Sequence, residues 1–204
     1  MADSPTRILL VEDHPIVRLG LATVLNAQED FIVIAESDRA QQAMEAVGRE
    51  QPDLVILPLR LDGTSAGLEL CREIKSHDPA PQVMMYTSFS SPSDATMAFL
   101  SGADSFLTKD HPESRLLEVV RSTVRGQRVW NTNADADQSA RSLEESVEAS
   151  SLTSREQEVL GFMLQRYTNA EIGRELFISI PTVKTHVSKV LQKLGLDSRK
   201  DLFE

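Results

Sequence analysis

Five short apolar runs, separated by stretches with helical periodicity, dominate the first 126 residues of this chain. The runs are ILLV (8–11), FIVIAE (31–36), LVIL (54–57), VMMYT (83–87) and SFLT (105–108). Continuously apolar runs of this length are typical of parallel strands that are covered on both faces. Their alternation with helices predicts a doubly wound α/β domain with a five-stranded parallel sheet, and the carboxyl ends of the strands then share one functional edge.

Within this domain, the stretch after the first strand has one face at helical spacing, formed by Ile16, Leu19, Gly20, Thr23 and Val24.

The remaining residues differ in character from this domain. Residues 127–150 are rich in Asp, Glu, Ser and Ala and predict a solvated linker between domains 1–126 and 151–204. The last domain is predicted to be a small all-α unit. Its helices are capped at Thr153 with Glu156, at Asn169, at Ser179 and at Gly195, and a final short helix begins near Ser198.

Charge and cysteine content narrow the classes of protein that fit. The net charge of −10 argues at first against nucleic acid, but the 54 residues from Ser151 onward carry eight Lys/Arg and seven Asp/Glu. A near-neutral module of this kind binds DNA when its cations lie on one face, because phosphate contacts are local. The single cysteine, Cys71, rules out an internal disulfide framework and fits a reducing cytoplasm. No apolar run approaches the roughly 18 residues of a membrane span, so no membrane association is expected.

The third helix of the C-terminal domain has an apolar stripe opposite a polar one. The apolar stripe consists of Ile180, Val183, Val187, Val190, Leu191 and Leu194. The polar stripe consists of Lys184, Thr185, Ser188 and Gln192, flanked by Thr182, His186 and Lys189. Short polar and cationic groups suit the major groove of DNA, and the short connection at 177–179 is that of a helix-turn-helix. A solvated helix of an ordinary bundle explains the composition equally well.

Three segments of this domain closely resemble the DNA-binding domain of LuxR-type regulators. They are LTSREQEVL (152–160), NAEIGRELFIS (169–179) and TVKTHVSKVLQKLGL (182–196). The resemblance implies that residues 180–194 form the recognition helix on double-stranded DNA. It implies base-facing positions at Lys184, Thr185 and Ser188, with Thr182 and Lys189 against phosphate. It also implies a homodimer formed through the last helix.

Polar side chains gather at the predicted functional edge of the first domain. Glu12 and Asp13 follow the first strand, Thr87 ends the fourth and Lys109 ends the fifth. Paired acids at such an edge suit a hard divalent cation such as Mg²⁺. With VEDHPIVRLGL (11–21) and GADSFLTKD (102–110), this set resembles the receiver domain of NarL/FixJ response regulators over about residues 7–126. The resemblance implies an aspartate acceptor at the end of the third strand and a relay through Phe106 on the fifth.

The acceptor position departs from that pattern. The third strand reads PDLVILPLRLDG (52–63), and Pro58 stands where the family has the phosphorylated aspartate. Proline offers neither a nucleophile nor a side-chain oxygen for a metal. Asp53 lies at the far end of the strand, and Asp62 with Gly63 is more simply a turn. The sequence therefore predicts a degenerate phosphorylation pocket, with no metal and no cofactor, made of Glu12, Asp13, Pro58, Thr87, Phe106 and Lys109.

These observations favour a DNA-binding transcription regulator that works independently of aspartyl phosphorylation. Its receiver is expected to act as an interaction module for dimerisation, for another regulator protein or for a small ligand. The alternative is an adaptor that docks on another regulator through the receiver and has no sequence preference for DNA. An enzyme has little support, because no nucleophile–base pair or Gly-rich phosphate loop is present.

Overall fold

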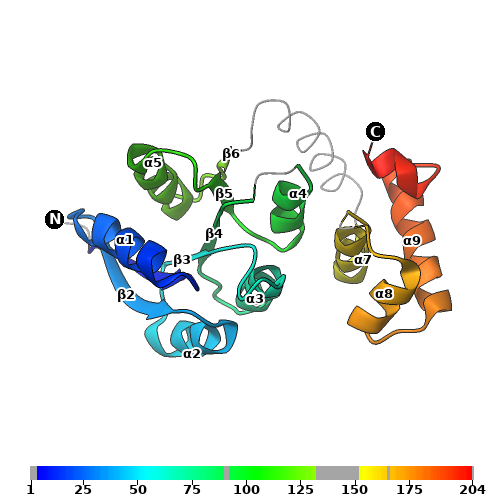
Figure 1. The fold of residues 1–204 in the computed structure, drawn as a ribbon, viewed down its shortest axis with the longest axis horizontal. Coiled ribbons are helices and arrows are strands. Elements are labelled where there is room, and N and C mark those ends of the chain that lie inside the picture. The colour runs from blue at the N-terminus through cyan, green and yellow to red at the C-terminus, as the bar shows by residue number, and fades with distance from the viewer. Residues whose placement is uncertain (1–3, 90–91, 132–151, 165, 204) are drawn as a thin grey trace. The chain divides into compact units, whose positions relative to one another are not determined.

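The fold was analysed in a computed structural model, which describes residues 4–89, 92–131, 152–164 and 166–203. The chain divides into two compact units, Met1–Asn133 and Ala134–Glu204 (Figure 1). Most of the predicted linker, residues 127–150, lies outside the described residues. No helix among the described residues is long and apolar enough to cross a membrane.

The first unit contains the predicted parallel sheet. Its five main strands are β1 (Thr6–Val11), β2 (Phe31–Ser37), β3 (Leu54–Leu57), β4 (Gln82–Thr87) and β5 (Ser105–Thr108). All neighbours pair in parallel in the order β2-β1-β3-β4-β5, which confirms the doubly wound prediction. The order in which successive strands are added to the sheet reverses between β1 and β3, and ligands of such folds bind at the strand carboxyl ends near this point.

Helices cover both faces of this sheet. They are α1 (Pro15–Asn26), α2 (Ala40–Glu50), α3 (Ala66–Lys75), α4 (Pro92–Leu100) and α5 (Glu113–Val124). α1 and α5 lie on one face, where their apolar side chains share a core with alternate residues of the strands, and α2, α3 and α4 lie on the other (Figure 1). The interiors of β3, β4 and β5 are buried on both sides, as their continuous apolar sequence requires, whereas the edge strand β2 is partly exposed and Ile32 on it is 42% exposed.

The buried face of α1 differs from the face noted in the sequence. The structure buries Leu21, Ala22 and Leu25, whereas Ile16 is 86% exposed and Leu19 is 68% exposed. Apolar residues occur around most of this helix, so periodicity offers two stripes at nearly equal spacing. Only the packing of the helix on the sheet selects one of them.

A sixth strand continues the sheet where the linker was predicted to begin. β6 (Trp130–Asn131) pairs in parallel with β5, and the Phe106 N–H donates to the Val129 carbonyl at 2.8 Å. The Trp130 ring stacks on Phe106 with centroids 6.2 Å apart, and it meets Phe99 edge-on at 5.7 Å. The apolar pair Val129-Trp130 thus extends the packed unit beyond the boundary expected at residue 126.

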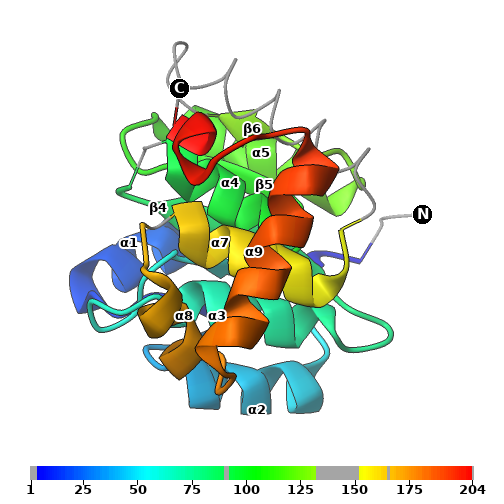
Figure 2. The same cartoon turned by 90° about the vertical axis from the view of Figure 1, so that its right-hand side faces the viewer.

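The second unit is helical, as predicted. Its elements are α7 (Ser154–Leu164), α8 (Asn169–Glu175), α9 (Ile180–Leu194) and the 3-10 helix η1 (Arg199–Phe203). Figure 2 shows α9 lying across α7 and beside α8, and it packs against both. The first helix opens with the predicted capping box, in which the Thr153 N–H donates to Glu156 at 2.9 Å.

Two details at the helix ends differ from the sequence analysis. Thr168 rather than Asn169 caps α8, because a capping box needs an acid three residues later and Glu171 supplies it. The last segment is a 3-10 helix, fixed by Arg199, whose guanidinium donates to the carbonyls of Met163 and Tyr167. Ser179 caps α9, and Gly195 ends it at φ 69°, both as predicted.

An ion pair between α7 and α9 gives the second unit an expected pH dependence. The Lys193 ammonium, 2.7 Å from the buried Glu156 carboxylate, and the Thr153 N–H lower the pKa of Glu156 to about 2. Because the folded state holds this pKa below the unfolded value of 4.5, the stabilisation is present above pH 4.5 and is lost as pH falls toward 2. The protection factors of the backbone amides in α7 and α9 should fall over this range in the wild type, and less steeply in Glu156→Gln. Equal pH slopes in the two proteins would contradict the assignment.

Candidate functional site

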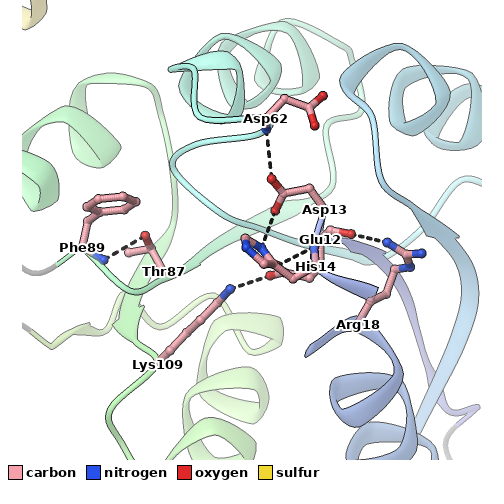
Figure 3. Close-up of polar contacts among 8 residues, drawn as sticks. All are labelled: Glu12, Asp13, His14, Arg18, Asp62, Thr87, Phe89 and Lys109. Atoms are coloured by element: carbon pink, nitrogen blue, oxygen red, sulfur yellow. Dashed lines mark hydrogen bonds and ion pairs between the residues drawn. The ribbon is translucent and has the colours of Figure 1, made fainter. Parts of the chain in front are cut away.

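The carboxyl edge of the sheet brings together the charged residues predicted there. Glu12 and Asp13 directly follow β1, and Lys109 directly follows β5 (Figure 3). The Lys109 ammonium donates to the Glu12 carboxylate at 2.5 Å across 97 positions of sequence. The side chain of Glu12 is only 2% exposed and that of Lys109 is 18% exposed, so this is a largely buried ion pair.

The remaining polar groups at this edge also have partners within the chain. His14 donates its backbone N–H to the Glu12 carboxylate at 3.2 Å, and its ring lies 3.0 Å from Asp13. Asp13 accepts the Asp62 N–H at 2.9 Å. Burial opposes ionisation of Asp13, but the hydrogen bonds from Asp62 and His14 outweigh it and lower the pKa of Asp13. The Thr87 hydroxyl oxygen accepts the Phe89 N–H at 3.2 Å.

Pro58 directly follows β3 and is buried, and the chain after it is packed tightly. Leu59 and Leu61 are each 2% exposed. A Cβ on Gly67, in the first turn of α3, would lie 1.9 Å from the Pro58 carbonyl oxygen, so this close approach requires glycine. The segment leaves no acidic side chain at the end of β3.

The two nearby aspartates do not replace such a side chain. Asp53 precedes β3 at the opposite edge of the sheet, where its carboxylate accepts the Arg7 N–H at 2.8 Å. Asp62 is exposed, and it is its backbone N–H that contacts Asp13.

The residues at this edge do not fit a hard divalent cation. Ligand atoms of Glu12, Asp13 and His14 lie within 4.8 Å of one another. However, the Lys109 ammonium already neutralises Glu12, and Pro58 contributes no side-chain oxygen. Cations such as Mg²⁺ require several oxygen ligands in near-ideal geometry, and the third carboxylate position is missing here.

Phe106 links this edge to the end of the first unit. Its side chain is fully buried on β5, and the Trp130 ring stacks on it. Two residues further along β5, Thr108 pairs with Thr87, and the Lys109 N–H donates to the Thr87 carbonyl at 2.7 Å. The polar edge and the aromatic stack therefore share strand β5.

In the second unit, α9 presents the predicted polar stripe to solvent. All five of its predicted DNA-contacting residues are exposed: Thr182, Lys184, Thr185, Ser188 and Lys189. Val183 and Val190 are fully buried on the opposite side. His186 differs from the rest of the polar side, since its ring Nδ1 is buried and has no hydrogen-bond partner among the described residues.

Two apolar residues at the start of α9 were missed as part of the exposed surface. Ile180 was assigned to the buried stripe, yet it is 46% exposed, and Phe177 in the preceding turn is 96% exposed. Helical spacing puts Ile180 on the apolar stripe, but it is the first residue of α9 and burial in this helix begins at Val183. Phe177 has a positive φ of 53°, which no sequence pattern indicates.

Both units match known protein families. Residues 8–121 match the response regulator receiver domain. Residues 150–204 match the family described as bacterial regulatory proteins, luxR family.

Known proteins with both units align along nearly the whole chain. The transcriptional regulatory protein LiaR of Bacillus subtilis is 33% identical over 95% of this chain and 92% of its own length. The DNA-binding transcriptional activator DevR/DosR of Mycobacterium tuberculosis is 33% identical over 95% of this chain and 90% of its own. Among solved structures, the response regulator ChrA of a heme-sensing two-component system is 32% identical with a TM-score of 0.54, over 98% of this chain and 94% of that one.

Proposed function

Because the chain belongs to the response regulators that join a receiver domain to a LuxR-type DNA-binding domain, we propose that it binds DNA without a phosphoryl switch. Membership of this family makes it a DNA-binding transcriptional regulator of the response-regulator type and not an enzyme. The observation that carries the proposal is the buried Pro58 at the end of β3, where the phosphorylated aspartate of a receiver is expected. A proline side chain cannot attack a phosphodonor.

The neighbouring contacts support a structural rather than a catalytic use of this pocket. A receiver lysine that binds phosphoryl oxygen must offer its charge to the incoming group, but here the Lys109 charge is compensated by Glu12. Asp13 holds the loop after β3 through the Asp62 N–H. The side chains that would serve phosphoryl transfer instead tie β1, β5 and the loop after β3 together.

We propose that the receiver acts as an interaction module in a cytoplasmic regulator that works as a homodimer. The intact sheet and its packed helices supply a stable scaffold without the phosphorylation chemistry. Its input would then be a partner protein or a small ligand rather than a phosphoryl group.

On the DNA side, α9 is proposed as the recognition helix. Its exposed stripe offers Lys184, Thr185 and Ser188 to base edges, with Thr182 and Lys189 at the flank for phosphate. Recognition helices of helix-turn-helix proteins present their N-terminal residues to the major groove, and these positions lie in the first three turns of α9.

The Lys184→Ala variant should weaken specific binding. Loss of one specific base contact costs about 1–3 kcal/mol, or roughly fivefold to 150-fold in affinity. The measurement is fluorescence anisotropy on the preferred duplex at fixed salt concentration, because phosphate contacts make affinity strongly salt-dependent. Arg39→Ala, which removes an exposed cation from the receiver, is the matched control and should leave affinity unchanged. Equal affinities of Lys184→Ala and wild type would argue against this assignment.

The test of the proposed function is selection of DNA from a random pool by the full chain, with and without acetyl phosphate and Mg²⁺. A defined motif with dyad symmetry, recovered equally under both conditions, is the expected result. Enrichment only with the phosphodonor would refute phosphorylation independence. Recovery of no motif under either condition would instead favour the adaptor role.

A further inference from the structure

The start of α9 carries an apolar surface that the fold of the second unit does not use. Among the described residues of this unit, Phe177 and Ile180 are the large hydrophobic side chains that stand well exposed, at 96% and 46%. Together these two residues are called the apolar tip. Burial of such side chains is normally favourable, so their exposure at a functional surface points to a binding partner.

The turn before α9 is built to hold the apolar tip outward. Phe177 has φ 53°, a conformation that is unfavourable for a bulky residue. Ile178 follows it, and its N–H donates to the Gly173 carbonyl at 3.0 Å. A Cβ on Gly173 would lie 2.9 Å from the Ile178 carbonyl oxygen, so the turn is pressed closely against α8. Ile178 and Gly173 close the turn, while Phe177 faces solvent.

The apolar tip is continuous with the cationic side of α9. Ile180 is the first residue of this helix, and Lys184 lies one turn later on the same side. The Ser179 side chain caps the helix by accepting the Thr182 N–H at 3.3 Å, which fixes the first turn. The exposed residues around Ile180 therefore carry positive charge and hydroxyl groups, which complement a nucleic acid.

The major groove offers one kind of apolar group to such a tip. Recognition helices enter the groove with their N-terminal residues against base edges. Thymine places its C5 methyl group there, and the other bases show only hydrogen-bonding groups. We propose that Ile180, with Phe177 ahead of it, contacts a thymine methyl group and so determines part of the sequence preference. This inference rests on the proposed DNA-binding function.

The experiment replaces single thymines by deoxyuridine in a duplex selected by the full-length protein. Deoxyuridine keeps the base-pairing edge and removes only the methyl group. Loss of one buried methyl contact is expected to weaken binding about fourfold, since a buried methylene is worth about 0.8 kcal/mol. The wild type should show this loss at one thymine of each half-site. Ile180→Ala should bind the thymine and deoxyuridine duplexes equally, and Phe177→Ala should show a reduced difference.

Control variants separate this inference from the function on which it rests. Ile32→Ala truncates an exposed isoleucine of the receiver and should keep the full thymine preference. If no thymine matters to the wild type while Lys184→Ala still loses specific binding, the methyl contact is wrong and DNA recognition by α9 stands. If alanine at both tip positions leaves every affinity unchanged, the apolar tip does not contact the DNA and the inference fails. If the wild type selects no motif, the proposed function fails as well.

Discussion

Replacing Lys109 with methionine is expected to lower the free energy of unfolding of the receiver by about 3 kcal/mol, because it leaves a buried charge without its partner. The Glu12 carboxylate is almost fully buried, and Lys109 is its cationic partner at 2.5 Å. In the variant, the exposed His14 is the one partner among the described residues that would still contact this carboxylate. Urea unfolding followed by the fluorescence of Trp130, the single tryptophan of the chain, measures the receiver by itself.

Two comparisons test whether burial of the ion pair causes this loss. Arg49→Met breaks a pair with Glu50 at 2.7 Å, but the arginine side chain is 69% exposed, so the loss should stay below about 1 kcal/mol. The double variant Glu12→Gln with Lys109→Met removes both charges and should be more stable than Lys109→Met alone. If Lys109→Met lowered the free energy of unfolding no more than Arg49→Met does, the ion pair between Glu12 and Lys109 would not stabilise the pocket.

Phe106→Ala should destabilise the receiver by about 4 kcal/mol, the range of a large buried aromatic truncated to alanine. Phe106 is fully buried on β5, and its ring supports Trp130 at 6.2 Å. Losing this support should also shift the emission of Trp130 to longer wavelength, because the tryptophan then gains contact with water. Urea unfolding followed by circular dichroism provides the free energy, and fluorescence of the folded protein provides the emission shift.

Phe89→Ala is the matched control for this prediction. Phe89 is 40% exposed, and Arg60 lies over its ring at 4.2 Å, an interaction worth about 0.5–1 kcal/mol at an exposed site. Its removal should cost less than that of the fully buried Phe106 and should leave the Trp130 emission unchanged. If Phe106→Ala were as stable as Phe89→Ala, the stack between β5 and β6 would not be part of the core.

The architecture could be predicted because its signals are local and repeated. Each strand is a continuous apolar run, and every one of the five forms where the run occurs. The helix caps at Ser179 and Gly195 likewise depend on one or two neighbouring residues. The cap of α8 also depends on a neighbouring residue, because Glu171 completes a capping box with Thr168 and not with the adjacent Asn169.

Features that depend on distant residues could not be predicted. The sequence placed Glu12 and Lys109 at one edge, but their direct pairing is a tertiary contact that no spacing indicates. The sixth strand depends on the fit of Trp130 against Phe106 and Phe99. The sequence of α1 contains two apolar stripes, and the stripe with Leu21 and Leu25 is the one that packs on the sheet.

We propose that the receiver accepts no phosphoryl group, and this is checked by the intact mass of the purified chain after incubation with acetyl phosphate and Mg²⁺. A receiver that retains its acceptor aspartate serves as the positive control under the same conditions. The mass of this chain should stay unchanged while the control gains one phosphoryl group. A phosphoryl adduct on the wild-type chain, lost in Asp62→Asn or Asp13→Asn, would instead show that another carboxylate has taken over from the position of Pro58 and that the receiver is still phosphorylated.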